Sequence, residues 1–195
     1  MLAKIILSAI LTCAGSLWIN KLYSRSAELS FPNEIARRSR YRAAILFCAL
    51  AFLLNATDDL RIMAAIYLLV LMTITDFEQY MLFDAMTLPL ALLGGICAWQ
   101  GGFLTEHLLA AIIGGGIFLL PAIISKGALG GGDVKLIAAL GLWFGSEKLL
   151  NVVLTGTIAG GVAAFLLILT KQKDRKSYFA YGPYFALSAI YFLLT

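Results

Sequence analysis

One aspartate stands in a setting where an acidic side chain needs a specific reason. Asp133 lies in SKGALGGGDVKLIAALGLWFG, residues 125–145, directly after three glycines and directly before an apolar segment. An ionisable residue at the edge of a membrane segment is costly, so it is interpreted as functional and a partner is expected. A second acid, Asp76, occupies a similar place, because it ends an apolar segment and begins DFEQYMLFDAMTLPL, residues 76–90.

Two carboxylates that lie close together cannot both ionise cheaply, so they share a proton and divide the roles of acid and base. Such a dyad can activate water for attack on a peptide carbonyl, while the protonated partner binds the carbonyl oxygen and assists the departing amine. This chemistry requires neither a metal nor a covalent intermediate. The sequence agrees, because it contains a single histidine, His107, no HExxH motif, and no serine or cysteine nucleophile with a base beside it. We therefore predict no metal and no cofactor.

The neighbours of Asp133 suit a substrate-binding loop. Gly130 and Gly132 allow positive φ and close backbone approach, so an extended peptide could lie against them. Lys135, two residues beyond Asp133, would raise the local positive potential and favour an ionised acid. It is equally well interpreted as one more positive charge beside the membrane.

The elements that must position these residues are membrane helices. The 195 residues are 61% hydrophobic and only 13% charged, whereas a soluble domain carries about 25% charged residues. The apolar runs are long and uninterrupted, which predicts helices rather than barrel strands. We expect an all-α, polytopic membrane protein with one domain over residues 1–195, a retained first helix, and three cysteines that are small core residues. About eight transmembrane helices are predicted, at 2–23, 42–57, 61–76, 85–100, 106–125, 133–146, 148–170 and 179–195.

Positive charge predicts the orientation of these helices. An N-terminus outside the cytoplasm puts twelve Lys and Arg residues in the cytoplasmic connections and leaves three, Lys4, Arg61 and Lys148, on the other side. Both termini should then lie outside, and both Asp76 and Asp133 should lie at the cytoplasmic ends of their helices. The basic run RRSRYR, residues 37–42, is interpreted as a segment facing lipid headgroups, and no nucleic-acid partner is expected.

Four segments together resemble the type IV prepilin peptidases. GALGGGDVKLIAALGLWFG is similar to the GxGD motif of that family and the helix after it, with Gly130, Gly132 and Asp133 in the motif positions. ITDFEQYMLFDAMTLPL resembles the other aspartate segment, which puts Asp76 in the position of the first catalytic acid. CAGSLWINKLYSR and YGPYFALSAI are similar to patterns in the first and last helices. The resemblance implies an aspartyl protease of the bacterial inner membrane, which removes the short basic leader of prepilins or pseudopilins at the cytoplasmic face, usually after a glycine.

Two departures from the family pattern affect these expectations. Larger members carry a cytoplasmic domain with two zinc-binding CxxC pairs between their first two helices, and they N-methylate the product with S-adenosylmethionine. Here that connection is residues 24–41 and contains no cysteine, so we expect methyltransferase activity to be absent or supplied by another protein. The family usually has a proline where this chain has Phe83. The next residue, Asp84, is a rival to Asp76 that we interpret as a helix N-cap.

Two other functions are compatible with paired membrane acids. A proton-coupled transporter could use Asp76 and Asp133 as a relay, although both acids are expected at one face and no inverted repeat is visible. An inactive assembly factor of a pilus or secretion machine could keep the fold, although both acids are intact. Glu78, together with other acids outside the pair, is interpreted as a solvated loop charge.

Overall fold

Helices form all the regular structure that the computed structural model shows in the residues it describes, 2–124, 130–170 and 179–195. This confirms the all-α class. Two short 3₁₀ turns, Pro32–Glu34 and Leu54–Ala56, accompany the α-helices. The helices are α1 (Leu2–Arg25), α2 (Ile35–Arg38), α3 (Arg42–Leu53), α4 (Leu60–Gln79), α5 (Asp84–Gln100), α6 (Leu104–Ile124), α7 (Gly131–Leu169) and α8 (Gly182–Leu194).

The length and apolar composition of several helices fit a multi-pass membrane protein. Among the described residues, α1, α4, α6 and α7 are long and apolar enough to cross a membrane. A fifth span is counted if Pro32–Arg38 and Arg42–Ala56, which meet at a bend of 58°, cross as one unit. The predicted count of eight spans is not confirmed, and the sides on which the termini lie stay a prediction.

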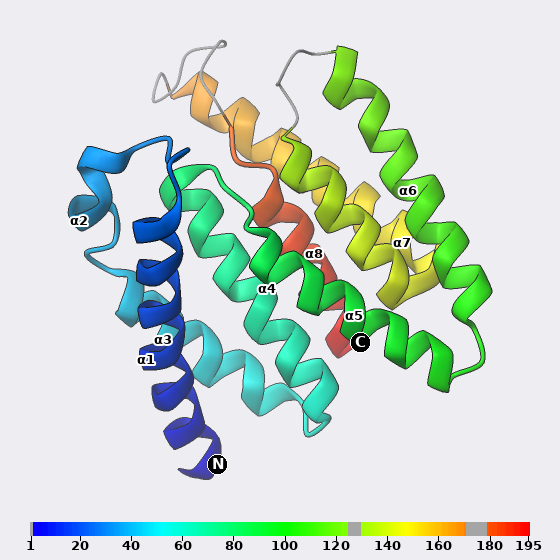
Figure 1. The fold of residues 1–195 in the computed structure, drawn as a ribbon, viewed down its shortest axis with the longest axis horizontal. Coiled ribbons are helices and arrows are strands. Elements are labelled where there is room, and N and C mark those ends of the chain that lie inside the picture. The colour runs from blue at the N-terminus through cyan, green and yellow to red at the C-terminus, as the bar shows by residue number, and fades with distance from the viewer. Residues whose placement is uncertain (1, 125–129, 171–178) are drawn as a thin grey trace.

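The α7 range consists of two helical segments joined at Gly145. This residue has φ 66° and ψ −173°, a conformation that glycine adopts readily and other residues do not. Figure 1 shows the chain running one way before this break and returning after it. The two segments correspond to the predicted helices 133–146 and 148–170. The short α2 helix, in contrast, lies in the connection 24–41, for which no helix was predicted.

The α4 helix is the centre of the fold. Its apolar window is 56% buried, against 17–22% for the windows of the other three long helices. It contacts α1, α3, α5 and α8, and Figure 1 shows it between α1 and α3 on one side and α5 and α8 on the other. Its last turn carries Asp76, which is therefore surrounded by protein rather than lipid.

Lipid exposure explains one wrong prediction about the cysteines. Cys13 and Cys48 are exposed and Cys97 is half-buried, so the first two are not core residues. An apolar side chain in a membrane helix faces lipid as readily as it faces another helix, because lipid tails are equally apolar. Hydrophobicity alone could not distinguish the two positions.

Candidate active site

Asp76 is held in the last full turn of α4. Its side chain is only 5% exposed. Tyr80 ends the helix in a left-handed conformation with φ 52°, and its backbone N–H donates to the Asp76 carbonyl oxygen at 2.9 Å. The chain thus turns away from α4 four residues after the acid, and Asp76 stays inside the helix bundle.

Asp133 is held in the first turn of α7. The N-cap residue is Gly130, and its backbone N–H donates to Asp133 Oδ2 at 3.2 Å. Asp133 therefore caps the helix from the third helical position, as the acidic partner in a capping box does. The side chain is 8% exposed. The hydrogen bond fixes the carboxylate and leaves its other oxygen, Oδ1, free to face the interior.

The two carboxylates meet beside Gly182, the first residue of α8. A Cβ atom built on Gly182 would lie 2.7 Å from Asp76 Oδ2 and 3.2 Å from Asp133 Oδ1. The two oxygens are therefore at most about 6 Å apart, the sum of these two distances. Three segments far apart in sequence, 76, 133 and 182, thus converge at one point. Gly182 was not singled out from the sequence, although the last-helix pattern YGPYFALSAI contains it.

The same two oxygens lack a hydrogen-bond partner within the described part of the chain. Asp76 Oδ2 and Asp133 Oδ1 are both buried, and neither accepts a hydrogen bond there. Buried polar atoms are nearly always satisfied, and exceptions call for a functional explanation. The backbone N–H of Gly182, which has no acceptor within α8, faces the Asp76 carboxylate. The site therefore combines two acids with unused hydrogen-bonding capacity.

Gly130 and Gly132 act through close packing and not through positive φ. Gly130 has φ −69°, and Gly132 is not among the glycines with positive φ. A Cβ on Gly132 would lie 2.8 Å from Leu82 Cβ, and one on Gly130 would lie 3.3 Å from Asp133 Oδ2. Both glycines therefore allow the chain itself to pack closely against Asp133 and Leu82. Contact of these glycines with a substrate stays a prediction.

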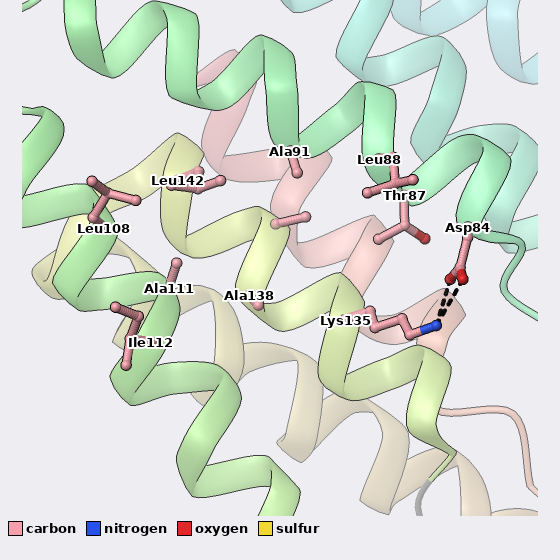
Figure 2. Close-up of a pocket in the computed structure, with 11 residues that line it drawn as sticks. Asp84, Thr87, Leu88, Ala91, Leu108, Ala111, Ile112, Lys135, Ala138 and Leu142 are labelled. Carbon is pink, nitrogen blue, oxygen red and sulfur yellow. Dashed lines mark hydrogen bonds and ion pairs between the residues drawn. The ribbon is translucent and has the colours of Figure 1, made fainter.

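Lys135 and Asp84 form an ion pair with each other. Lys135 Nζ donates to Asp84 Oδ1 at 2.7 Å and to Oδ2 at 2.8 Å, and both side chains are 57% exposed. Phe83 is the N-cap residue of α5 and Asp84 is the first helical residue. Asp84 is therefore not the N-cap itself, but it is an acid in the first turn, where the helix dipole favours it. The cation that engages Asp84 is therefore the Lys135 ammonium group. Figure 2 shows the pair at the end of an apolar groove of about 480 Å³ between α5, α6 and α7.

A buried ion pair on the other side of α4 was missed. Arg42 is 4% exposed, and its guanidinium donates through Nε and Nη2 to the Glu78 carboxylate. Tyr23 Oη donates to Glu78 Oε2 at 2.9 Å, and Arg42 Nη1 donates to Asn20 Oδ1 at 2.6 Å. Glu78 is therefore not a solvated loop charge, and Arg42 does not face headgroups. Packing of α1, α3 and α4 removes both groups from water, and each satisfies the other.

The connection between α1 and α3 also clamps the end of α4. Arg38 Nη1 donates to the Glu78 carbonyl oxygen at 3.0 Å, and its guanidinium lies 3.6 Å from the centre of the Phe31 ring. The Gln79 side chain exchanges two hydrogen bonds with the Phe31 backbone. The sequence signal for the buried Arg42–Glu78 cluster is weak: the first-helix pattern contains Asn20 and Tyr23, which bond to Arg42 and Glu78, but nothing in it indicates these partners.

No group of three or more His, Cys, Asp or Glu side chains that could hold a metal ion occurs in the described ranges. The single histidine, His107, lies in the first turn of α6, where its Nδ1 is 2.8 Å from the Leu142 carbonyl oxygen. It therefore contacts α7 near the break at Gly145 and not the acids.

Comparisons with known proteins point to one family. The model of the type IV leader peptidase family matches residues 63–165. A prepilin leader peptidase/N-methyltransferase of Neisseria gonorrhoeae is 37% identical over 127 residues, which is 62% of this chain and 43% of that protein. One of Escherichia coli K12 is 30% identical over 155 residues, which is 76% of this chain and 68% of that protein. The chain spans less than half the length of the first relatives it matches. No solved structure matches it.

Proposed function

Because this chain belongs to the type IV leader peptidase family, we propose that it is a membrane aspartyl endopeptidase that hydrolyses the leader peptide bond of a prepilin or pseudopilin. Asp76 and Asp133 form the dyad that activates the attacking water. The observation that carries this proposal is the convergence of two buried, unpartnered carboxylate oxygens on Gly182.

The geometry supports a division of labour between the two acids. Two carboxylates in one buried site cannot both be charged cheaply, so a single proton is shared between them. The Gly130 N–H orients Asp133, and its Oδ1 is left to accept a proton from water. The protonated partner donates a hydrogen bond to the carbonyl oxygen and later transfers its proton to the leaving amine. All of these steps use the two free oxygens.

The cellular setting of the proposal follows from charge and hydropathy. Lys and Arg are concentrated in residues 21–42 and 171–176, which the predicted topology puts on the same side of the membrane as both acids, and this favours the cytoplasmic face for Asp76 and Asp133. A substrate with a short leader on that face and an apolar segment in the lipid would present its cleavage bond at this depth. We therefore place the enzyme in the bacterial inner membrane, with lipid around it and a prepilin or pseudopilin as its protein partner.

The dyad is tested with isosteric substitutions. The purified chain is reconstituted in phosphatidylethanolamine–phosphatidylglycerol liposomes and incubated with a synthetic prepilin that carries its leader. We expect Asp76→Asn and Asp133→Asn each to lower kcat by at least about 100-fold, the lower range for loss of an acid–base group. Asp84→Asn is the matched control and should keep most of the activity, because Asp84 pairs with Lys135 outside the dyad.

The variants must also be shown to be folded. Each should insert, migrate as a single species on gel filtration and unfold with the same cooperativity as the parent. Normal cleavage by either Asn variant of the dyad would contradict the mechanism. Loss of activity in Asp84→Asn with full activity in Asp76→Asn would transfer the first catalytic role to Asp84.

We also propose that methyl transfer is not performed by this chain. The relatives are named for both activities, but the connection 24–41 carries no cysteine pair with which to build a zinc domain. Mass spectrometry of the product should therefore show a trimmed, unmodified N-terminus when the chain acts with S-adenosylmethionine present. A methyl group added by the purified chain alone would contradict this proposal.

A further inference from the structure

A groove of about 240 Å³ lies between α3 and α4, on the side of α4 that carries Glu78. Arg38, Arg42 and Glu78 line its polar end. Below them the lining is apolar and includes Ile45 and Phe77, which are 56% and 52% exposed. The α3–α4 groove is therefore open to the surroundings of the two helices, which in a membrane are lipid tails.

The polar end of the α3–α4 groove carries more positive charge than its acids neutralise. The run 37–42 contains four arginines. Glu78 pairs with Arg42, and Glu34 accepts a hydrogen bond from Arg38 Nε at 3.2 Å. The other two arginines of the run are exposed and form no ion pair within the part of the chain that the structure describes. This end therefore attracts an anion.

Arg38 is held at the mouth of this groove with one side of its guanidinium still available. Its Nη1 donates to the carbonyl oxygens of Phe77 and Glu78 at 3.4 and 3.0 Å, and the group stacks on the Phe31 ring. Among the described residues its Nη2 has no hydrogen-bond partner, and the side chain is 26% exposed. An arginine fixed in this way presents planar N–H donors of the kind that bind phosphate.

We propose that the α3–α4 groove binds one anionic phospholipid, whose phosphate pairs with Arg38 and whose acyl chain lies along Ile45 and Phe77. Positive charge above an open apolar groove fits a molecule with an anionic head and an apolar tail. Basic pockets between membrane helices on the cytoplasmic side bind such headgroups. A basic leader peptide would be repelled here, so the groove is not a place for the leader of the proposed substrate. The inference does not depend on protease activity.

The expected magnitude follows from the two kinds of contact. The net contribution of one hydrogen bond to a charged group corresponds to at least about a tenfold change in affinity. Removing two or more methylenes of the acyl chain from an apolar contact costs a factor of similar size. Loss of either the Arg38 charge or the apolar channel should therefore weaken lipid binding at least about tenfold.

The experiment titrates the full chain, in a neutral detergent, with phosphatidylglycerol or with phosphatidylcholine of the same acyl chains, and native mass spectrometry counts the bound lipid. We expect one phosphatidylglycerol to bind at least about tenfold more tightly than phosphatidylcholine. Arg38→Gln should remove this preference, and Thr73→Phe, which fills the half-buried floor of the groove and leaves the arginines in place, should weaken binding about tenfold or more. Arg25→Gln, an exposed arginine at the end of α1, and Leu88→Phe, at the groove of Figure 2, are the matched controls and should bind as the parent does.

The parent alone already tests the proposal, because equal affinity for the two lipids would overturn it whether or not any variant folds. An unchanged preference in Arg38→Gln would overturn the role of this arginine in binding the headgroup. An equal loss in Arg25→Gln would also overturn the site, since it would show attraction to positive charge in general. If glycerophosphoglycerol, the headgroup without acyl chains, bound as tightly as the lipid, or if Thr73→Phe bound as the parent does, then the groove would hold no acyl chain.

Discussion

Replacing Arg42 with methionine removes the cation from a buried cluster and leaves its partner charge behind. The side chains of Arg42 and Glu78 are 4% and 8% exposed. Without the guanidinium, the one side-chain hydrogen bond that Glu78 keeps within the described residues is that from Tyr23. Removing one partner of a buried pair typically costs 3–5 kcal/mol, so we expect Arg42→Met to lower the free energy of unfolding by about that amount.

Two further variants separate charge from packing. Arg61→Met is the matched control, because Arg61 pairs with Asp59 while 53% exposed, and an exposed pair is worth about 0–1 kcal/mol. The double variant Arg42→Met/Glu78→Met replaces both charges with apolar groups of similar length. The free energy of unfolding of the double variant should return to within about 1 kcal/mol of the parent value, since replacing both partners of a buried ion pair by apolar groups is often nearly neutral.

The assay is equilibrium unfolding in mixed micelles at increasing denaturing detergent, followed by tryptophan fluorescence. All four proteins are compared at the same lipid and salt concentrations. If Arg42→Met is no less stable than Arg61→Met, then the buried pair does not hold the end of α4. If the double variant is as unstable as the single, the cost arises from lost shape and not from an unpaired Glu78.

Two other predictions concern parts of the fold away from the acids. Gly145→Ala should lower the free energy of unfolding by about 1–3 kcal/mol in the same assay, because Gly145 has φ 66° and an added Cβ would clash with Glu106. Gly161→Ala is the control, because an added Cβ there meets no atom within 4 Å, and it should change stability by less than about 1 kcal/mol. Asp59 is the N-cap residue of α4 and accepts a hydrogen bond from the Arg61 backbone N–H. A side-chain hydrogen bond from Arg61 lowers the pKa of Asp59 to about 2, so the ionised form stabilises the folded protein at neutral pH. The difference in stability between parent and Asp59→Asn should therefore vanish as pH falls from about 4 through 2. A difference that persisted below pH 2 would contradict the capping role, and a tolerated Gly145→Ala would contradict the strained break.

The acids themselves could be predicted from the sequence because their setting is unusual. Few charges occur in so apolar a chain, and Asp76 and Asp133 each stand where an apolar segment ends or begins. Their convergence depends on Gly182, whose backbone approaches both carboxylates. A glycine gives no charge or periodicity signal, so the point at which the acids meet could be recognised only in three dimensions.

Arg42 and Glu78 show the opposite case, in which a strong sequence signal was misinterpreted. Arg42 closes the run RRSRYR, and a basic run beside a membrane segment usually faces headgroups. Its helix turns it inward instead, toward α4, where Glu78 lies. Sequence patterns report that a charge is near the membrane surface, but the partner is set by the packing of α1, α3 and α4.

The last turn of α4 serves two purposes because its residues point in different directions. Successive residues in a helix are about 100° apart, so Asp76 and Glu78 lie on nearly opposite sides. Glu78 is clamped by Arg42 and Tyr23, while Asp76 is turned toward α7 and α8. A rigid clamp on one side therefore fixes the direction of the acid on the other. It follows that the Arg42→Met/Glu78→Met protein, if its stability returns, should also recover cleavage, since Asp76 requires a well-packed opposite face and not a charged one.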